Sequence, residues 1–128
     1  MRNSSGAILG TATHKVRKIG GGGFVTGFGI SNNGATKVCG MDVFNCYRFA
    51  TGDTEWKELF TAASLPSGEW SISAGSKTDG RGCYAVKVAP NDPTRIYATY
   101  NARWYVSSDT GATFTRASGL GYLNMLAN

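Results

Sequence analysis

Turn-forming segments of this chain hold carboxylate, aromatic and guanidinium side chains that could bind or hydrolyse a sugar. The group consists of Asp42, Glu69, Trp70, Asp79, Arg81, Tyr100 and Arg103. A tryptophan ring beside carboxylates and arginines suits a sugar platform, and loops held by rigid strands commonly carry function. The alternative for Trp70 is a lid that packs over the core. The predicted ligand-binding residues are therefore Trp70, Asp79, Arg81, Tyr100 and Arg103.

A second motif, "SSDTGATF" at residues 107–114, matches the Asp-box pattern Ser/Thr-x-Asp-x-Gly-x-Thr-Trp/Phe. The matching residues are Ser107, Asp109, Gly111, Thr113 and Phe114. We expect Asp109 to accept hydrogen bonds from amides of its own turn, and Gly111 to take a positive φ. Phe114 would anchor the last strand between sheets. Asp boxes recur in propellers of sialidases and many other proteins as structural turns, so Asp109 is not a catalytic candidate.

Metal ligands and cofactor motifs are scarce in this sequence. It has three cysteines, Cys39, Cys46 and Cys83, with no CxxC spacing, and His14 is the only histidine. This set does not provide the ligands of a zinc site. We therefore predict no metal and no cofactor. The cysteines are interpreted as small buried apolar residues, with a disulfide between two of them left open.

The composition favours short strands and tight turns over helices. Only 16% of the 128 residues are charged, 18 residues are glycine, and the aromatic residues are scattered along the chain. No window of about 11 residues has a helical apolar stripe. Strand-forming residues between turn-forming ones are instead typical of an all-β domain.

The net charge of +5 is spread along the chain, with one dense run at residues 14–18. A nucleic-acid-binding protein usually concentrates its positive charge on one element. Charged side chains also protect strand edges from association. We interpret the run as a solvated edge, with a polyanion contact at Lys15–Lys18 as a weaker alternative, and do not favour a nucleic-acid partner.

The start of the sequence does not resemble an export signal or a membrane anchor. The apolar run at residues 7–9 is too short for the core of a signal peptide. No stretch approaches the roughly 18 apolar residues of a membrane span. We therefore expect the cytoplasm of the producing cell as the location, without a membrane span.

An internal repeat gives the domain organisation. Shifting the sequence by 58 positions pairs Phe28 with Val86, Tyr47 with Tyr105, and Trp56 with Phe114 without a gap. Under this alignment Asp42 pairs with Tyr100. Each half then reads as four short strands, at residues 24–30, 37–41, 46–49 and 56–60, and at 83–89, 95–100, 104–107 and 113–116.

Four antiparallel strands at this period match a propeller blade. The predicted fold is all-β, with two four-stranded antiparallel propeller-type blades, a partial β-propeller, and the Asp box in the second. The divisions are an arm at 1–18, a first repeat at 19–61, a connecting loop at 62–81, a second repeat at 82–118, and a tail at 119–128. Because successive turns alternate between two ends of a sheet, Gly20–Gly23, Asp42, the connecting loop and Arg103 are expected at one end.

Three segments carry a resemblance to a known family: "IGGGGFVTGFGIS" at 19–31, "CGMDVFNCYRF" at 39–49 and "TEWKEL" at 54–59. They resemble the first blade of xyloglucan-active glycoside hydrolases built from two seven-bladed propellers. The resemblance covers residues 18–59 well and "CYAVKVAPNDPTRIYATY" more loosely. The same opening is similar to propeller-type proteins of bacteriophages described as tail or structural proteins, in which a Phe-containing turn followed by Tyr is common.

The resemblance implies a role for Asp42. By position it falls on the general base of these inverting hydrolases, whose two carboxyl groups lie about 6.5–9.5 Å apart. In the family the general acid comes from the second propeller, which has no counterpart here. The family's Gly-Gly after this Asp-Ile/Val is replaced by Phe44 and Asn45. The alternative is that Asp42 caps its turn.

Two functions from different classes follow. The first is a structural or binding module, such as a virion-associated tail or fibre protein, that assembles with other chains and contacts a glycan. Two open blades expose sheet faces and edges that favour association. The second is a fragment of a β-glucan hydrolase with Asp42 as base. Whether this chain alone is an enzyme stays open at this point.

Overall fold

The computed structural model describes residues 15–19, 24–42, 45–70, 83, 85–101 and 103–118. Gly20–Gly23, Phe44, Asp79 and Arg81, as well as most of the predicted arm, connecting loop and tail, lie outside these residues. The described residues form eight strands. They are β1 (Val25–Ile30), β2 (Thr36–Met41), β3 (Cys46–Ala50), β4 (Lys57–Glu58), β5 (Val86–Ala89), β6 (Asp92–Tyr100), β7 (Arg103–Ser107) and β8 (Thr115–Arg116).

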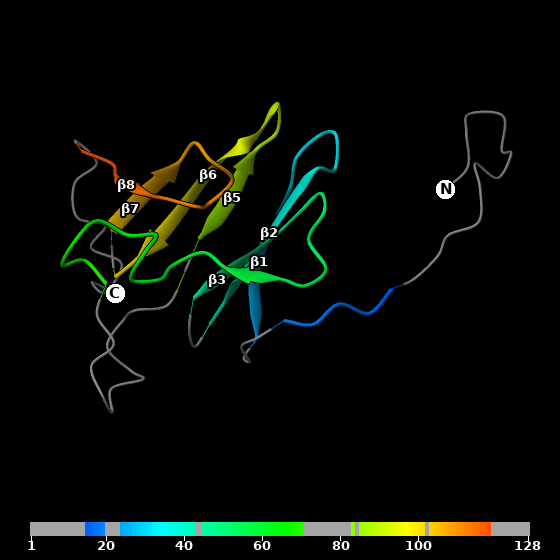
Figure 1. Cartoon of the computed structure of the whole chain (residues 1–128), viewed down its shortest axis with the longest axis horizontal. Helices are drawn as coiled ribbons and strands as arrows, with labels where there is room; N and C mark the ends of the chain where they lie inside the picture. The colour runs from blue at the N-terminus through cyan, green and yellow to red at the C-terminus, as the bar shows by residue number, and fades with distance from the viewer. Residues whose placement is uncertain are drawn as a thin grey trace, which may run out of the picture.

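The strands form two antiparallel four-stranded sheets, which confirms the all-β prediction. The first sheet has the order β1-β2-β3-β4 and the second has the order β5-β6-β7-β8 (Figure 1). Each sheet is a simple meander, in which every strand pairs with the next one along the chain. The fourth strands, β4 and β8, have only two residues each and are shorter than expected. No helix occurs within the described ranges.

Short polar side chains determine where the first turn bends. Asn33 Oδ1 accepts hydrogen bonds from the Ala35 amide at 3.1 Å and from the Ser31 hydroxyl at 2.8 Å, and Gly34 follows at φ 69°. Such Asn and Gly positions are typical of tight turns. The neighbouring turn of the second sheet lies alongside, because Asn32 Nδ2 donates to Asn91 Oδ1 at 2.6 Å. The first turns of both sheets therefore lie together.

The main core lies between the two sheets. Its fully or nearly buried side chains are Val38, Cys46, Leu59, Phe60, Leu65, Cys83, Val86, Val88, Ile96, Ala98, Tyr100, Tyr105 and Phe114. The Phe60 ring is at its centre, with centroids 4.9 Å from both Tyr100 and Phe114. Gly40 allows the chain before β5 to approach the first sheet, since a Cβ there would lie 3.0 Å from the Cys83 carbonyl oxygen. Aromatic burial from both repeats thus joins the sheets.

The strand registers correct the gapless 58-residue alignment in one strand of each repeat. Phe28 pairs with Cys39, which pairs with Tyr47. In the second sheet the corresponding row is Val86, Ala98 and Tyr105. The first and third residues of the two rows are 58 positions apart in the sequence. The middle residues, Cys39 and Ala98, are 59 positions apart.

An irregularity between Val88 and Ala89 accounts for the extra residue. β-Bulges insert one residue into a strand in this way. The second turn is shorter by one residue, which restores the offset. Asp42, the residue after β2, therefore corresponds to Asn101, the residue after β6, and not to Tyr100. The expected pairing of Asp42 with Tyr100 was wrong for this reason.

Candidate functional site

Asp42 lies directly after β2 and joins the end of that strand to the start of β1. Its Oδ1 accepts the Phe24 N–H at 2.7 Å, and its own N–H donates to the Phe24 carbonyl at 3.0 Å. The residue is exposed. Both hydrogen bonds join Asp42 to Phe24, 18 positions earlier in the sequence, so they tie β2 to β1 and are not contacts within its own turn. The structure thus gives Asp42 a defined structural contact, and its predicted catalytic role stays a prediction.

Asn45 performs a backbone function that the sequence did not reveal. It is 1% exposed and has φ 57°. Its Oδ1 accepts the N–H groups of Cys46 at 2.8 Å and Phe60 at 3.0 Å, and its Nδ2 donates to the Phe60 carbonyl at 2.7 Å. Asn is among the few residues other than glycine that tolerate this conformation. An asparagine directly before an expected strand was the available signal.

Trp70, Tyr100 and Arg103 come together at the same end as Asp42. The Trp70 ring is partly buried and stacks on Tyr100, with centroids 5.9 Å apart and planes inclined by 14°. Tyr100 is 1% exposed and ends β6, where it pairs in register with Arg103 at the start of β7. This packing is the lid arrangement for Trp70. It places the ring over the core, and sugar binding by this group stays a prediction.

Glu69 attaches the segment after the first sheet to the second sheet. Its Oε2 accepts a short hydrogen bond from the Tyr105 hydroxyl, and its Oε1 lies 3.9 Å from Arg116 Nη1. Burial raises the pKa of Tyr105, and the bond to Glu69 raises it further, to about 12, against the opposing effect of Arg103. Tyr105 was not predicted as a site residue, since its partner is 36 residues away along the chain.

The turn at residues 107–114 is built by side-chain hydrogen bonds. Asp109 Oδ1 accepts from the Thr113 N–H at 2.9 Å and from the Ser107 hydroxyl at 2.7 Å, while Thr113 Oγ1 donates to Oδ2 at 2.6 Å. Gly111 has φ 83° as expected, and Phe114 is 4% exposed. Desolvation would raise the pKa of Asp109, but these bonds lower it to about 2. The contacts are those of a structural turn.

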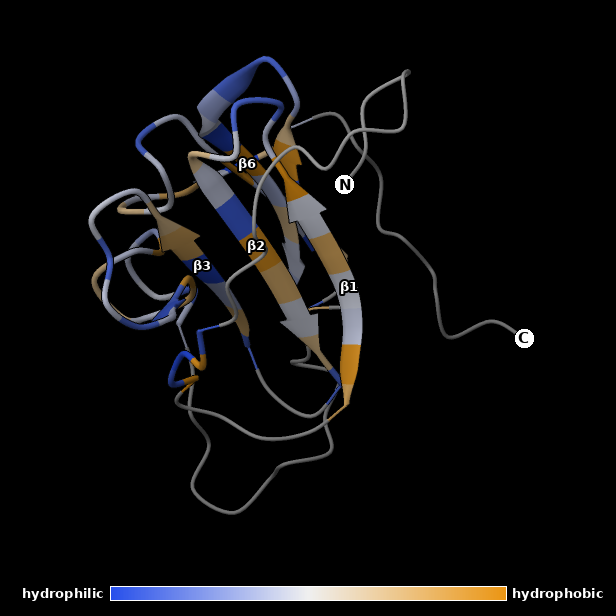
Figure 2. Ribbon diagram, turned by 90° about the vertical axis from the view of Figure 1, so that its right-hand side faces the viewer, coloured by the Kyte–Doolittle hydropathy of each residue, from blue (hydrophilic) through white to orange (hydrophobic). Residues whose placement is uncertain are grey.

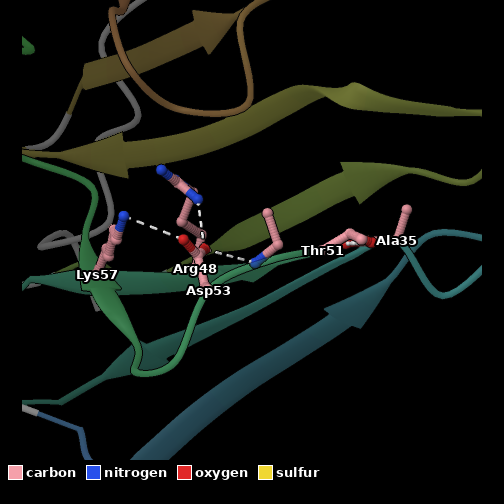
Figure 3. Close-up of polar contacts among 6 residues, drawn as sticks. Ala35, Arg48, Thr51, Asp53 and Lys57 are labelled. Atoms are coloured by element: carbon pink, nitrogen blue, oxygen red, sulfur yellow. Dashed lines mark hydrogen bonds and ion pairs between the residues drawn. The ribbon is translucent and has the colours of Figure 1, made fainter.

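A charged network in the first sheet was also missed. Asp53 Oδ2 lies 2.6 Å from Arg48 Nη1 and accepts the Ala50 N–H at 2.8 Å, and Asp53 Oδ1 lies 3.0 Å from Lys57 Nζ (Figure 3). Desolvation opposes ionisation, but the Ala50 N–H and the two cations lower the pKa of Asp53. In the same view the Thr51 N–H donates to the Ala35 carbonyl at 2.8 Å. Asp53 thus stabilises the turn between β3 and β4 through ion pairs with Arg48 of β3 and Lys57 of β4.

The cysteines are buried free thiols, in agreement with the apolar interpretation. Burial raises the pKa of Cys39 to about 11, and burial together with neighbouring Cys83 raises that of Cys46 well above its ordinary value. Such thiols are protonated at neutral pH and are poor nucleophiles. Among the described residues, no group of three His, Cys, Asp or Glu side chains could hold a metal ion.

On the outer face of the first sheet, the edge strand β1 is apolar and open. Phe28 and Ile30 of β1 are 51% and 49% exposed, and Val25 is similarly open. Figure 2 views this face, which is turned away from the second sheet, and shows hydrophobic residues alternating along β1. Beside them on the same face lies a small buried cluster of Cys39, Met41 and Tyr47, against which Trp56 packs. The first sheet therefore packs one face on the second sheet and presents apolar side chains on the other.

The basic segment at residues 15–19 runs beside the first sheet. These residues are exposed, the Lys18 carbonyl accepts the Trp56 N–H at 3.0 Å, and the Arg17 guanidinium lies 5.1 Å from the Phe49 ring centroid. A cation over an aromatic ring is a favourable contact. The segment thus supplies the solvated charged border that was expected beside the sheet, and a polyanion contact stays an untested alternative.

Comparisons with known proteins do not assign a family. No protein-family model matches the chain, and no curated protein matches it. In the part of the chain that the structure describes, no helix is long and apolar enough to cross a membrane. The fold and side-chain contacts are therefore the basis for any functional assignment.

Proposed function

We propose that this chain is a structural and binding module that assembles with other protein chains through the open face of its first sheet. The observation that supports it most strongly is the exposure of Val25, Phe28 and Ile30 on one continuous strand. Contiguous exposed apolar side chains are typical of protein interaction surfaces. Isolated exposed side chains would need no such explanation.

The two sheets also leave strand edges available for association. β1 and β4 are the outer strands of the first sheet, and β5 and β8 are those of the second. Blade-like sheets bury their faces on neighbouring blades. The resemblance to bacteriophage propeller proteins extends the proposal to a virion-associated tail or fibre component. Contact with a glycan, through the end that carries Trp70, Tyr100 and Arg103, belongs to the same proposal.

The hydrolase alternative receives less support. Asp42 Oδ1 is occupied by the Phe24 N–H, and this contact ties β1 to β2. An inverting hydrolase needs a second carboxyl group at a defined separation. Asp42 therefore serves the assembly proposal as a residue that keeps the open strand in place.

Co-expression with the products of neighbouring genes tests the proposal. Light scattering after size-exclusion chromatography would measure the mass of each purified complex against the 13.5 kDa of one chain. We expect a complex with at least one product that is lost in a Phe28→Glu variant. A chain that stays alone with every product, and with itself, would contradict the proposal.

A further inference from the structure

We propose that the open face of the first sheet binds the second sheet of another copy of this chain, in a head-to-tail arrangement. The proposal rests on the proposed function and names the partner. The leading face is defined as Phe28, Ile30, Cys39, Tyr47 and Phe49 of the first sheet. The trailing face is defined as Tyr97, Thr99, Trp104 and Val106 of the second sheet.

The leading face is the structural counterpart of the surface that already joins the two sheets. Its row Phe28–Cys39–Tyr47 corresponds by register to the row of Val86, Ala98 and Tyr105. That second row is buried in the core between the sheets. This side of the second repeat is thus covered by a preceding sheet. In the first repeat Phe28 is 51% exposed on this side, while Cys39 and Tyr47 are buried beside Trp56.

The two tyrosines of these rows differ in one contact. The Tyr105 hydroxyl donates to Glu69, which lies in the segment that follows the preceding sheet. The Tyr47 hydroxyl is buried without a hydrogen-bond partner in the part of the chain that is described. A buried polar group without a partner is destabilising. Within the described residues, the first repeat therefore lacks the polar partner that Glu69 supplies to Tyr105 in the second repeat.

The trailing face is the side of the second sheet that is turned away from the core. Side chains alternate along a strand, so the burial of Ile96 and Ala98 in the core directs Tyr97 to the opposite side. Tyr97 is 38% exposed and pairs in register with the half-buried Val106. Thr99 is only 3% exposed and pairs with the half-buried Trp104. Within one chain, the second sheet packs on one face of the first sheet. The trailing face is the same side of the second sheet, so it continues the existing interface.

One copy therefore carries both sides of the contact. Different patches that bind head to tail form rings when the rotation closes. Because propellers have roughly four to eight blades, a ring would contain about two to four copies. Pairing of two leading faces is the competing arrangement, and it would leave every trailing face unused.

Two single-face variants distinguish these arrangements by sedimentation velocity of the full chain. Phe28→Glu alters the leading face and Tyr97→Glu alters the trailing face, both at half-exposed positions. Ala63→Glu, in an exposed turn outside both faces, is the control. Far-ultraviolet circular dichroism and urea unfolding establish that each variant is folded.

We expect the wild-type chain and the control to form one closed species, and each face variant alone to be monomeric. A charge buried in the contact should weaken association by at least about tenfold. Mixing the two variants should restore a single intact interface, giving a species of two chains and nothing larger.

Three results would overturn the head-to-tail proposal. They are assembly unaffected by Tyr97→Glu, no complex in the mixture, and a wild-type chain that stays monomeric at every concentration. A monomeric chain that still binds a neighbouring gene product through Phe28 would remove self-assembly and leave the proposed function standing. If that binding is also missing, both proposals fail.

Discussion

Replacing Gly111 by alanine should destabilise the contact between the two sheets. Gly111 has φ 83°, and a Cβ there would lie 2.3 Å from Leu59 Cδ2 of the preceding segment. The left-handed backbone costs an L-residue about 1–2 kcal/mol, and overpacking of a core costs about 1–3 kcal/mol. We therefore expect the free energy of unfolding to fall by about 3 kcal/mol, which is a large fraction of the stability of a small domain.

Gly52→Ala is the matched control, because Gly52 has φ 93° and no neighbouring atom lies within 4 Å of the position that a methyl group would occupy there. The free energy of unfolding of this variant should fall only by the cost of the left-handed backbone, about 1–2 kcal/mol. Urea unfolding followed by tryptophan fluorescence measures both values, provided the slope with denaturant is unchanged. If Gly111→Ala costs no more than Gly52→Ala, the close packing of this turn on the first sheet is refuted.

Three further predictions concern single polar residues. Asn45→Ala should lower the free energy of unfolding by at least about 3 kcal/mol in urea, because the buried polar backbone of Phe60 loses its partners. Asp109 has its pKa lowered to about 2 from 3.8, so its stabilising contribution is present above about pH 4 and is lost as the pH falls through about 2; acid unfolding followed by circular dichroism should show this. Asp42→Ala should cost about 1 kcal/mol, from the lost bond to Phe24, and a reducing-sugar assay should detect no β-glucan hydrolysis by either chain.

Each of these predictions has a control or a contradicting result. Asn45→Gly removes the hydrogen bonds but keeps the left-handed backbone free of strain, so it should cost about 1 kcal/mol less than Asn45→Ala. In Asp109→Asn, stability should fall less steeply with pH between about pH 4 and 2 than in the wild-type chain. An unchanged pH dependence would contradict the contribution assigned to Asp109. Sugar release by the wild-type chain that disappears in Asp42→Ala would instead establish the hydrolase alternative.

The sequence predicted the strands better than the contacts between them. Alternating apolar residues and Asn, Gly and Pro turns located all eight strands, since those signals are local. The register of β6 was wrong by one residue because a bulge near Val88 is compensated by a shorter second turn. Self-comparison without gaps cannot reveal two compensating changes.

The residues at the candidate site were predicted in the same uneven way. Alternation of turns correctly placed Asp42, Tyr100 and Arg103 at one end of the sheets, because strand direction determines it. The contact between Glu69 and Tyr105 could not be predicted, since it depends on how two separate sheets pack. Local patterns carry no information about such a tertiary contact.

Sedimentation equilibrium of the full wild-type chain tests the central claim most directly, because it measures mass without a probe or a partner. The open face of the first sheet predicts a single closed assembly whose mass is a small whole multiple of 13.5 kDa, in equilibrium with one chain on dilution. A mass of one chain at every concentration would contradict association through this face.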